Sequence, residues 1–167
     1  MKLDADLARR LLAYDPETGL LRWRERRRPC ISAGQVAGCV NPSGYVTVVI
    51  AGSSYKAHRV AWLMTHGEWP THHIDHINGN CSDNRLANLR SATRSQNLSN
   101  SRVRKDSTTG RKGVSFHRQV GKWVAYVNHQ GKRFYLGLFD SPEAAALARD
   151  TKARELHGEF ARCGGNR

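Results

Sequence analysis

The chain has 167 residues, with 27 Lys and Arg against 14 Asp and Glu, and its formal net charge at pH 7 is +13. Such an excess of positive charge favours a polyanionic partner, although a solvated basic surface or an RNA-binding protein would have the same composition. No apolar run reaches the roughly 18 residues of a membrane helix, and the N-terminus lacks the apolar stretch of a secretory signal. We therefore expect a cytoplasmic protein without a membrane partner.

The N-terminal third predicts one helix followed by short strands. Leucines recur on one face of residues 1–14, which predicts an amphipathic helix, and Asp15–Gly19 is typical of a turn. Leu20–Arg24 and the β-branched run Tyr45–Ile50 predict strands, the second in a hairpin with Tyr55–Ala57.

The segment from His72 to Asn100 is the richest in chemically useful side chains. The pair Asp75-His76 precedes Asn88 by 12 residues, counted from the histidine, and Asn97 follows 9 residues later. A carboxylate, an imidazole and an amide carbonyl are the groups that can hold a hard cation and activate a water molecule beside it.

The local pattern of this segment predicts a strand, a loop, a second strand and a helix. His73–Ile77 alternates apolar and polar residues, Asn78–Asn80 is strong turn chemistry, and Leu86–Arg90 can form the second strand. Thr93 is a suitable N-cap for a helix over Arg94–Ser101. Such a unit would bring Asp75 towards Asn97, which the sequence separation alone does not show.

The strings DHINGN, DNRLANLR and TRSQN resemble the HNH endonucleases of phages and homing introns, which have a ββα-metal nuclease fold. The resemblance covers residues 56–101. It implies that His76 is the general base, that Asn88 holds the loop and the base in place, and that Asp75 and Asn97 are the metal ligands. Asparagine stands where the family name has its last histidine, which favours oxygen ligation of Mg²⁺, or alternatively Mn²⁺.

The remaining histidines and the cysteines receive other interpretations. His72 and His73 lie near the motif and could contact DNA or metal, although the Asp75–Asn97 pair suffices without them. His58 opens a predicted helix and is expected to pack or to form a hydrogen bond rather than to act in catalysis. The cysteines form no C-x-x-C pair, so we expect reduced thiols and no structural zinc. They are Cys30, Cys39, Cys81 and Cys163.

The C-terminal third predicts a small sheet followed by one helix. Gly113–His117, Lys122–Asn128 and Lys132–Gly137 read as three strands joined by tight turns. Ser141 is a suitable N-cap with proline next to it, and the helical pattern continues to His157.

Residues 111–162 resemble the ethylene-response-factor, or Apetala, type of DNA-binding domain through KGVSFH, GKWVAYV, YLGLFDSPEAAALARD and ARELHGEF. The resemblance implies that the sheet lies in the major groove of double-stranded DNA. Strand alternation makes the outward candidates Ser115, His117, Tyr126, Asn128, Arg133 and Tyr135, with Lys112, Arg118 and Lys122 near the DNA backbone. Several positions that are Arg or Trp in plant members differ here, so the target sequence does not transfer.

The predicted fold class is α+β. Its parts are a β-rich N-terminal portion (1–55), a ββα-metal core (56–101), a linker (102–110), a three-stranded antiparallel sheet packed on one helix (111–162) and a tail (163–167). The leading functional hypothesis is a metal-dependent DNA endonuclease of phage, prophage or homing origin, in a bacterial or phage-infected cell. The alternative is a sequence-specific DNA-binding regulator with a vestigial nuclease site. No heptad indicates dimerisation, so we expect a monomer, and truncation after Ser101 should leave catalysis at high enzyme concentration.

Overall fold

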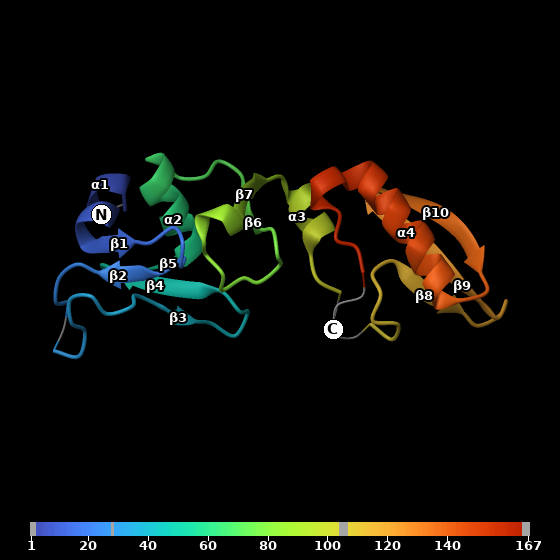
Figure 1. The fold of residues 1–167 in the computed structure, drawn as a ribbon, viewed down its shortest axis with the longest axis horizontal. Helices are drawn as coiled ribbons and strands as arrows, with labels where there is room; N and C mark the ends of the chain where they lie inside the picture. The colour runs from blue at the N-terminus through green and yellow to red at the C-terminus, as the bar shows by residue number, and fades with distance from the viewer. Residues whose placement is uncertain (1–2, 28, 104–106, 165–167) are drawn as a thin grey trace. The chain divides into compact units, whose positions relative to one another are not determined.

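The computed structural model describes residues 3–27, 29–103 and 107–164. The chain divides into two compact units, Met1–Ala92 and Thr93–Arg167, and each is described by itself (Figure 1). The predicted linker and tail each include residues outside the described ranges, namely 104–106 and 165–167. Within the described part of the chain, no helix combines the length and the apolar character needed to cross a bilayer.

The first unit starts with a shorter helix than the sequence predicts. Helix α1 spans Ala5–Leu11, and its N-cap Asp4 accepts a hydrogen bond from the Leu7 backbone N–H at 2.8 Å. The next residues, Leu12–Tyr14, form β1 instead of continuing the helix, because their backbone pairs with β2 (Leu21–Trp23) in an antiparallel hairpin.

A three-stranded sheet and a helix follow. Strands β3 (Cys39–Val40), β4 (Val46–Ile50) and β5 (Ser53–Lys56) are antiparallel in the order β3-β4-β5. Helix α2 (Ala57–His66) begins directly after β5 and ends at Gly67, whose left-handed φ of 83° suits a glycine.

The segment singled out in the sequence forms a two-stranded sheet. Strand β6 (His73–His76) pairs antiparallel with β7 (Leu89–Ala92). The second strand begins later than predicted, because Leu86–Asn88 forms a 3₁₀ turn, η1, in which the Asn88 N–H donates to the Arg85 carbonyl at 2.9 Å.

One hydrophobic core runs through most of the first unit. Trp23 and Val48 come from the predicted N-terminal portion, Val60 and Leu63 come from α2, and all four are buried in the same cluster. This cluster therefore crosses the predicted division at residue 55, and a second cluster of Ala61, Ile74 and Leu89 lies beyond it. Tyr14, from the N-terminal portion, packs against this second cluster and so contacts the hairpin that carries the motif.

The second unit contains α3 and the predicted sheet and helix. Strands β8 (Val114–His117), β9 (Lys122–His129) and β10 (Lys132–Phe139) form an antiparallel sheet in the order β10-β9-β8. Helix α4 (Pro142–His157) packs on this sheet and is followed by a 3₁₀ turn, η2 (Gly158–Phe160). The α+β class and the sheet-on-helix arrangement are confirmed (Figure 1).

Helix α3 (Arg94–Asn100) belongs to the second unit, although the predicted nuclease core extended through residue 101. Its start is as predicted: the Thr93 side chain caps the helix, and Gln96 completes a capping box. The compact-unit boundary thus falls between β7 and α3, within the predicted core.

Candidate functional site

Asp75 and His76 lie at the end of β6, and only 4% of each residue is exposed. Ile74 on the same strand packs with Leu89 and Ala61, which fixes the hairpin against α2. The register sets Asp75 opposite Arg90 and His76 opposite Leu89. The hairpin therefore holds a carboxylate and an imidazole at consecutive, buried positions of one strand.

Arg90 is the charge partner of Asp75. Its Nε and Nη2 atoms each lie 2.9 Å from Oδ2 of Asp75, and both side chains are largely buried. A buried carboxylate without a partner would be strongly unfavourable, so this ion pair stabilises the position of Asp75.

His76 is surrounded by aromatic rings and one amide. The ring of His58 meets it edge-on with centroids 4.9 Å apart, and Tyr45 lies 6.0 Å away. Burial lowers the pKa of His76, against opposing contributions from Asn84, Asp75 and Asp83. The imidazole is therefore neutral at pH 7, which is the form that can accept a proton.

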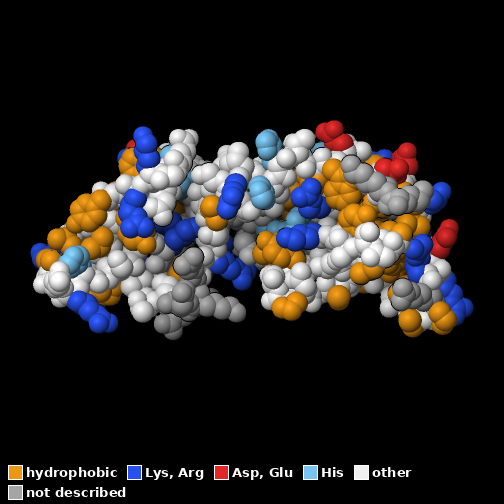
Figure 2. All heavy atoms as spheres, turned by 180° about the vertical axis from the view of Figure 1, so that it is seen from behind, with side chains coloured by type: hydrophobic (Ala, Val, Ile, Leu, Met, Phe, Trp, Pro, Cys, Tyr) orange, Lys and Arg blue, Asp and Glu red, His pale blue; other side chains and the backbone are white. Residues whose placement is uncertain are grey.

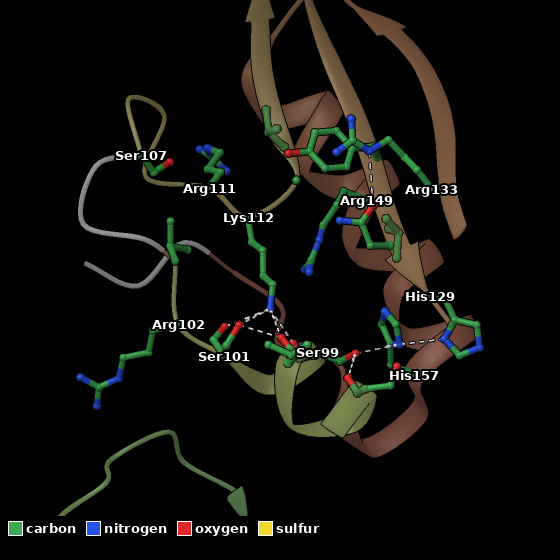
Figure 3. A pocket seen from close by; sticks show the side chains of 18 of the residues that line it. Ser99, Ser101, Arg102, Ser107, Arg111, Lys112, His129, Arg133, Arg149 and His157 are labelled. Carbon is green, nitrogen blue, oxygen red and sulfur yellow. Dashed lines mark hydrogen bonds between the residues drawn. The ribbon is translucent and has the colours of Figure 1, made fainter. Parts of the chain in front are cut away.

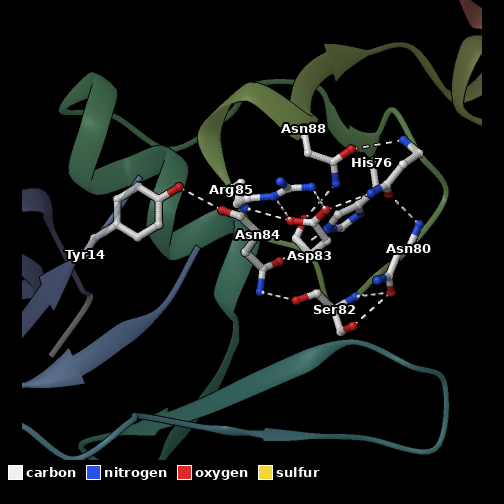
Figure 4. Close-up of polar contacts among 9 residues, drawn as sticks. Tyr14, His76, Asn80, Ser82, Asp83, Asn84, Arg85 and Asn88 are labelled. Carbon is white, nitrogen blue, oxygen red and sulfur yellow. Dashed lines mark hydrogen bonds and ion pairs between the residues drawn. The ribbon is translucent and has the colours of Figure 1, made fainter. Parts of the chain in front are cut away.

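Asn84 is the amide that contacts the His76 ring. The amide oxygen of Asn84 lies 3.3 Å from Nε2 of His76, and residue 84 is itself buried. An amide oxygen can only accept, so this contact is a hydrogen bond in the tautomer that carries its proton on Nε2 and its lone pair on Nδ1. The Asn84 backbone is held in turn by the Tyr14 hydroxyl, which donates to its carbonyl at 2.7 Å (Figure 4).

Asn88 fastens both ends of the loop that follows His76. Its Oδ1 accepts from the Asn78 N–H at 3.0 Å, and its Nδ2 donates to the Asp83 carbonyl at 2.8 Å (Figure 4). The Asp83 side chain is tied to Arg85, and hydrogen bonds from Arg85 lower the pKa of Asp83 to about 2. The loop is thus a hydrogen-bonded structure in which Asn88 occupies a central position.

Asn97 lies on α3 in the second unit. Its pairing with Asp75 in a metal site therefore stays a prediction from the sequence motif. His72 and His73 are exposed at the start of β6.

The outward candidates of the C-terminal sheet lie on one face. The register pairs Tyr126 with Tyr135 and Asn128 with Arg133, and β8 contributes its alternate residues opposite β9. The guanidinium of Arg133 lies 4.5 Å from the centre of the Tyr126 ring. The members of this face that were predicted to contact DNA are Ser115, His117, Lys122, Tyr126, Asn128, Arg133 and Tyr135.

The three basic residues predicted near the DNA backbone differ in their surroundings. Arg118 is exposed in the turn after β8, and Lys122 forms a solvent-accessible ion pair with Asp140. Lys112 instead directs its ammonium at the C-terminal end of α3, where the carbonyl oxygens of Leu98, Ser99 and Ser101 and the Ser101 hydroxyl lie within 3.1 Å. Its position is that of a helix-capping residue.

Positive charge is concentrated in the second unit. Residues 93–167 carry 15 Lys and Arg against 6 Asp and Glu, a net charge of +9, whereas residues 1–92 carry 12 against 8. On the face drawn in Figure 2, Lys and Arg side chains are spread widely and acidic side chains are few.

The family model for the HNH endonuclease matches residues 55–99. Protein 3.8 of Escherichia phage T7 is 38% identical over 112 residues, which make up 65% of this chain and 92% of that protein. The chain belongs to the HNH endonuclease family. It therefore carries a nuclease domain, and the residues of the β6–β7 hairpin lie within the matched range.

Two further comparisons extend beyond the nuclease range of this HNH endonuclease. APETALA2-like protein 2 of Oryza sativa subsp. indica is 43% identical over 47 residues, or 28% of this chain but only 11% of the plant protein. That match supports in part the assignment of an Apetala-type domain. A solved structure of the HNH homing endonuclease I-HmuI covers 94% of this chain and 91% of its own, with a TM-score of 0.45 and 18% identity. A likeness of that degree carries no argument about the site.

Several residues of the HNH site were missed in the sequence. Arg90 and Asn84 look like ordinary motif and turn residues, and Tyr45 lies outside the motif. His58 packs as expected, but the sequence did not show that its ring would lie against His76 and Tyr45; among the described residues its buried Nδ1 has no hydrogen-bond partner. The antiparallel register opposite Asp75 could have identified Arg90, whereas the other three depend on the tertiary packing.

Proposed function

We propose that the chain is a divalent-metal-dependent endonuclease that hydrolyses phosphodiester bonds in double-stranded DNA. The observation that carries the proposal is a buried, neutral His76 beside Asp75 on the hairpin of an HNH endonuclease domain. The strongly basic second unit with an Apetala-like sheet supports DNA as the substrate.

His76 is the general base of the proposed reaction. Its Nδ1 accepts a proton from the attacking water, while the Asn84 amide oxygen accepts the Nε2 hydrogen and keeps the ring in this tautomer. Asn88 acts through the loop, because its amide joins both loop ends. It is a positioning residue.

Asp75 and Asn97 are the proposed ligands of Mg²⁺, or alternatively Mn²⁺. A carboxylate offers about four acceptor sites, so the Arg90 pair is compatible with a cation at the same group. Among the described residues no three His, Cys, Asp or Glu side chains gather as a metal cage, which fits a cation that keeps waters and phosphate oxygens in its shell. A bound cation would stabilise the negative charge that develops on the phosphate oxygens.

The sheet of the second unit would bind the DNA groove and its backbone. Tyr126, Asn128, Arg133 and Tyr135 form the centre of the proposed contact, flanked by Ser115, His117, Arg118 and Lys122. Phage or prophage origin, a cytoplasmic location and a monomeric state remain predictions. A monomer with one active site would nick, and two binding events would give a double-strand break.

A plasmid-relaxation assay tests the proposal. The full-length protein should nick supercoiled plasmid with Mg²⁺ and not with EDTA. His76→Ala should abolish cleavage while binding DNA normally in EDTA, and His66→Ala, an exposed histidine of α2, should behave as wild type. Metal-independent DNA binding without any cleavage would instead favour the DNA-binding regulator that the plant relative suggests, and full cleavage by His76→Ala would refute the role of His76.

A further inference from the structure

Helix α3 is too short to be stable by itself. It has seven residues, whereas isolated helices shorter than about 12–15 residues are marginal in water. Its order must therefore come from its caps and from packing, and both are visible. The capping box closes the N-terminus, and the C-terminal residues Ser99 and Asn100 are buried within the second unit, where α3 contacts η2.

Lys112 closes the C-terminus of α3. Its Nζ lies 2.8 Å from the carbonyl oxygens of Leu98 and Ser99, and 3.1 and 3.0 Å from the carbonyl and hydroxyl oxygens of Ser101 (Figure 3). The last carbonyls of a helix have no partner within it and attract a cation. Burial lowers the pKa of Lys112 to about 8, as expected for an ammonium group taken out of water to serve protein oxygens.

The backbone next to Lys112 is fixed by the sheet. Gly113 has a φ of 69°, and a Cβ there would collide with the Tyr126 carbonyl oxygen. The Gly113 carbonyl also accepts from the Tyr126 N–H at 2.9 Å. Lys112 is therefore positioned by β9, which carries part of the proposed DNA-contacting face.

A second link joins α3 to the end of α4. The hydroxyl of Ser99 lies 3.1 Å from Nδ1 of His157, the last residue of α4, and that nitrogen is 3.2 Å from Nδ1 of His129 on β9 (Figure 3). These groups line a pocket of about 940 Å³ together with Lys112.

We propose that the Apetala-like sheet and helix anchor α3, and that Lys112 and His157 are positioning residues for the nuclease. The inference rests on the proposed function, because α3 carries Asn97, the proposed metal ligand. Loss of the anchors should loosen the ligand rather than weaken DNA binding. Truncation after Ser101 removes both anchors, so the truncated chain should lose metal-supported cleavage even at high enzyme concentration, contrary to the expectation from sequence.

The test compares full-length Lys112→Met with Lys152→Met. Lys152 is also a lysine of the second unit, and its ammonium pairs with Glu155 one turn along α4, with Nζ 2.6 Å from Oε1.

 The Lys152→Met substitution therefore removes one positive charge of the second unit without touching the contacts between Lys112 and α3. Cleavage rate is measured against Mg²⁺ concentration, DNA affinity is measured in EDTA by fluorescence anisotropy, and the order of α3 is followed by hydrogen exchange of its backbone amides.

Lys112→Met should raise the Mg²⁺ concentration for half-maximal cleavage by about tenfold and speed amide exchange in α3 by a similar factor, since charged hydrogen bonds are lost. Its DNA affinity should fall no further than that of Lys152→Met, and Lys112→Arg should restore part of the metal response. Should Lys112→Met fail to fold, Ser99→Ala, which removes the hydroxyl contact with His157, should shift exchange and metal response in the same direction.

Unchanged exchange and an unchanged metal response would overturn the inference. So would a loss of DNA affinity well beyond that of Lys152→Met with a normal metal response, because Lys112 would then be a DNA contact. If the wild type cleaves with no metal at all, the proposed function fails, and hydrogen exchange of α3 still decides whether the anchor exists.

Discussion

Replacing Arg90 by methionine tests how strongly the ion pair supports the nuclease hairpin. Two unit charges 2.9 Å apart attract each other by about 6 kcal/mol at an effective dielectric constant of ~20. Part of that attraction offsets the desolvation of both groups. Removing one partner of a buried pair nevertheless costs about 3–5 kcal/mol, because the other charge stays buried and uncompensated.

The free energy of unfolding is measured by urea titration in EDTA and followed by tryptophan fluorescence. Three of the four tryptophans, Trp23, Trp62 and Trp69, belong to residues 1–92, so the signal reports mainly on the first unit. Arg85→Met is the matched control, because Arg85 pairs with Asp83 at 2.6 Å but its side chain is 54% exposed.

Arg90→Met should lower the free energy of unfolding by several times the loss seen in Arg85→Met. Adding Asp75→Asn should recover part of the loss, since the buried charge is then removed as well. Equal losses in the two arginine variants, or no recovery in the double variant, would refute the assignment of a strong buried pair.

Three further predictions concern the two units. Burial lowers the pKa of His58 to about 3. Between pH 6 and pH 4 this histidine therefore binds a proton in the unfolded chain but not in the folded chain. Stability should therefore fall with decreasing pH by up to about 1.4 kcal/mol per unit, and His58→Phe should flatten this slope in urea titrations at each pH. Gly113→Ala should destabilise the chain in thermal melts far more than Gly121→Ala, because both have positive φ but only the first adds a collision with backbone. Arg133→Gln should reduce the slope of log affinity against log salt by about 1, and an unchanged slope would remove Arg133 from the DNA contact.

Local chemistry made parts of this fold predictable. Thr93 caps α3 as expected, and Ser141 followed by Pro142 starts α4. These features depend on residues within one helical turn, so nearby sequence determines them. Strand alternation likewise identified which residues of the C-terminal sheet share a face, because side chains alternate with a period of two.

Predictions failed where a backbone group had a distant partner. Leu12–Tyr14 continues the helical pattern, yet it pairs with β2 across a turn. Leu86 is held by a hydrogen bond from its N–H to the Pro16 carbonyl at 3.0 Å, at the start of the 3₁₀ turn that replaces the predicted strand. The local patterns predict the turn and the strand β2, but they do not show that Leu12–Tyr14 pairs with that strand or that Leu86 meets Pro16.

The sequence by itself determined the nuclease family, the identity of the candidate base and ligands, and the face of the C-terminal sheet, because motif spacing and strand period are local properties. Only the tertiary structure decided which groups surround His76 and what Lys112 does. The ring of His58, the amide of Asn84 and the carbonyls of α3 reach their partners through packing and register. The physical reason is that pKa, tautomer and capping depend on what is adjacent in space, and burial makes those neighbours energetically decisive.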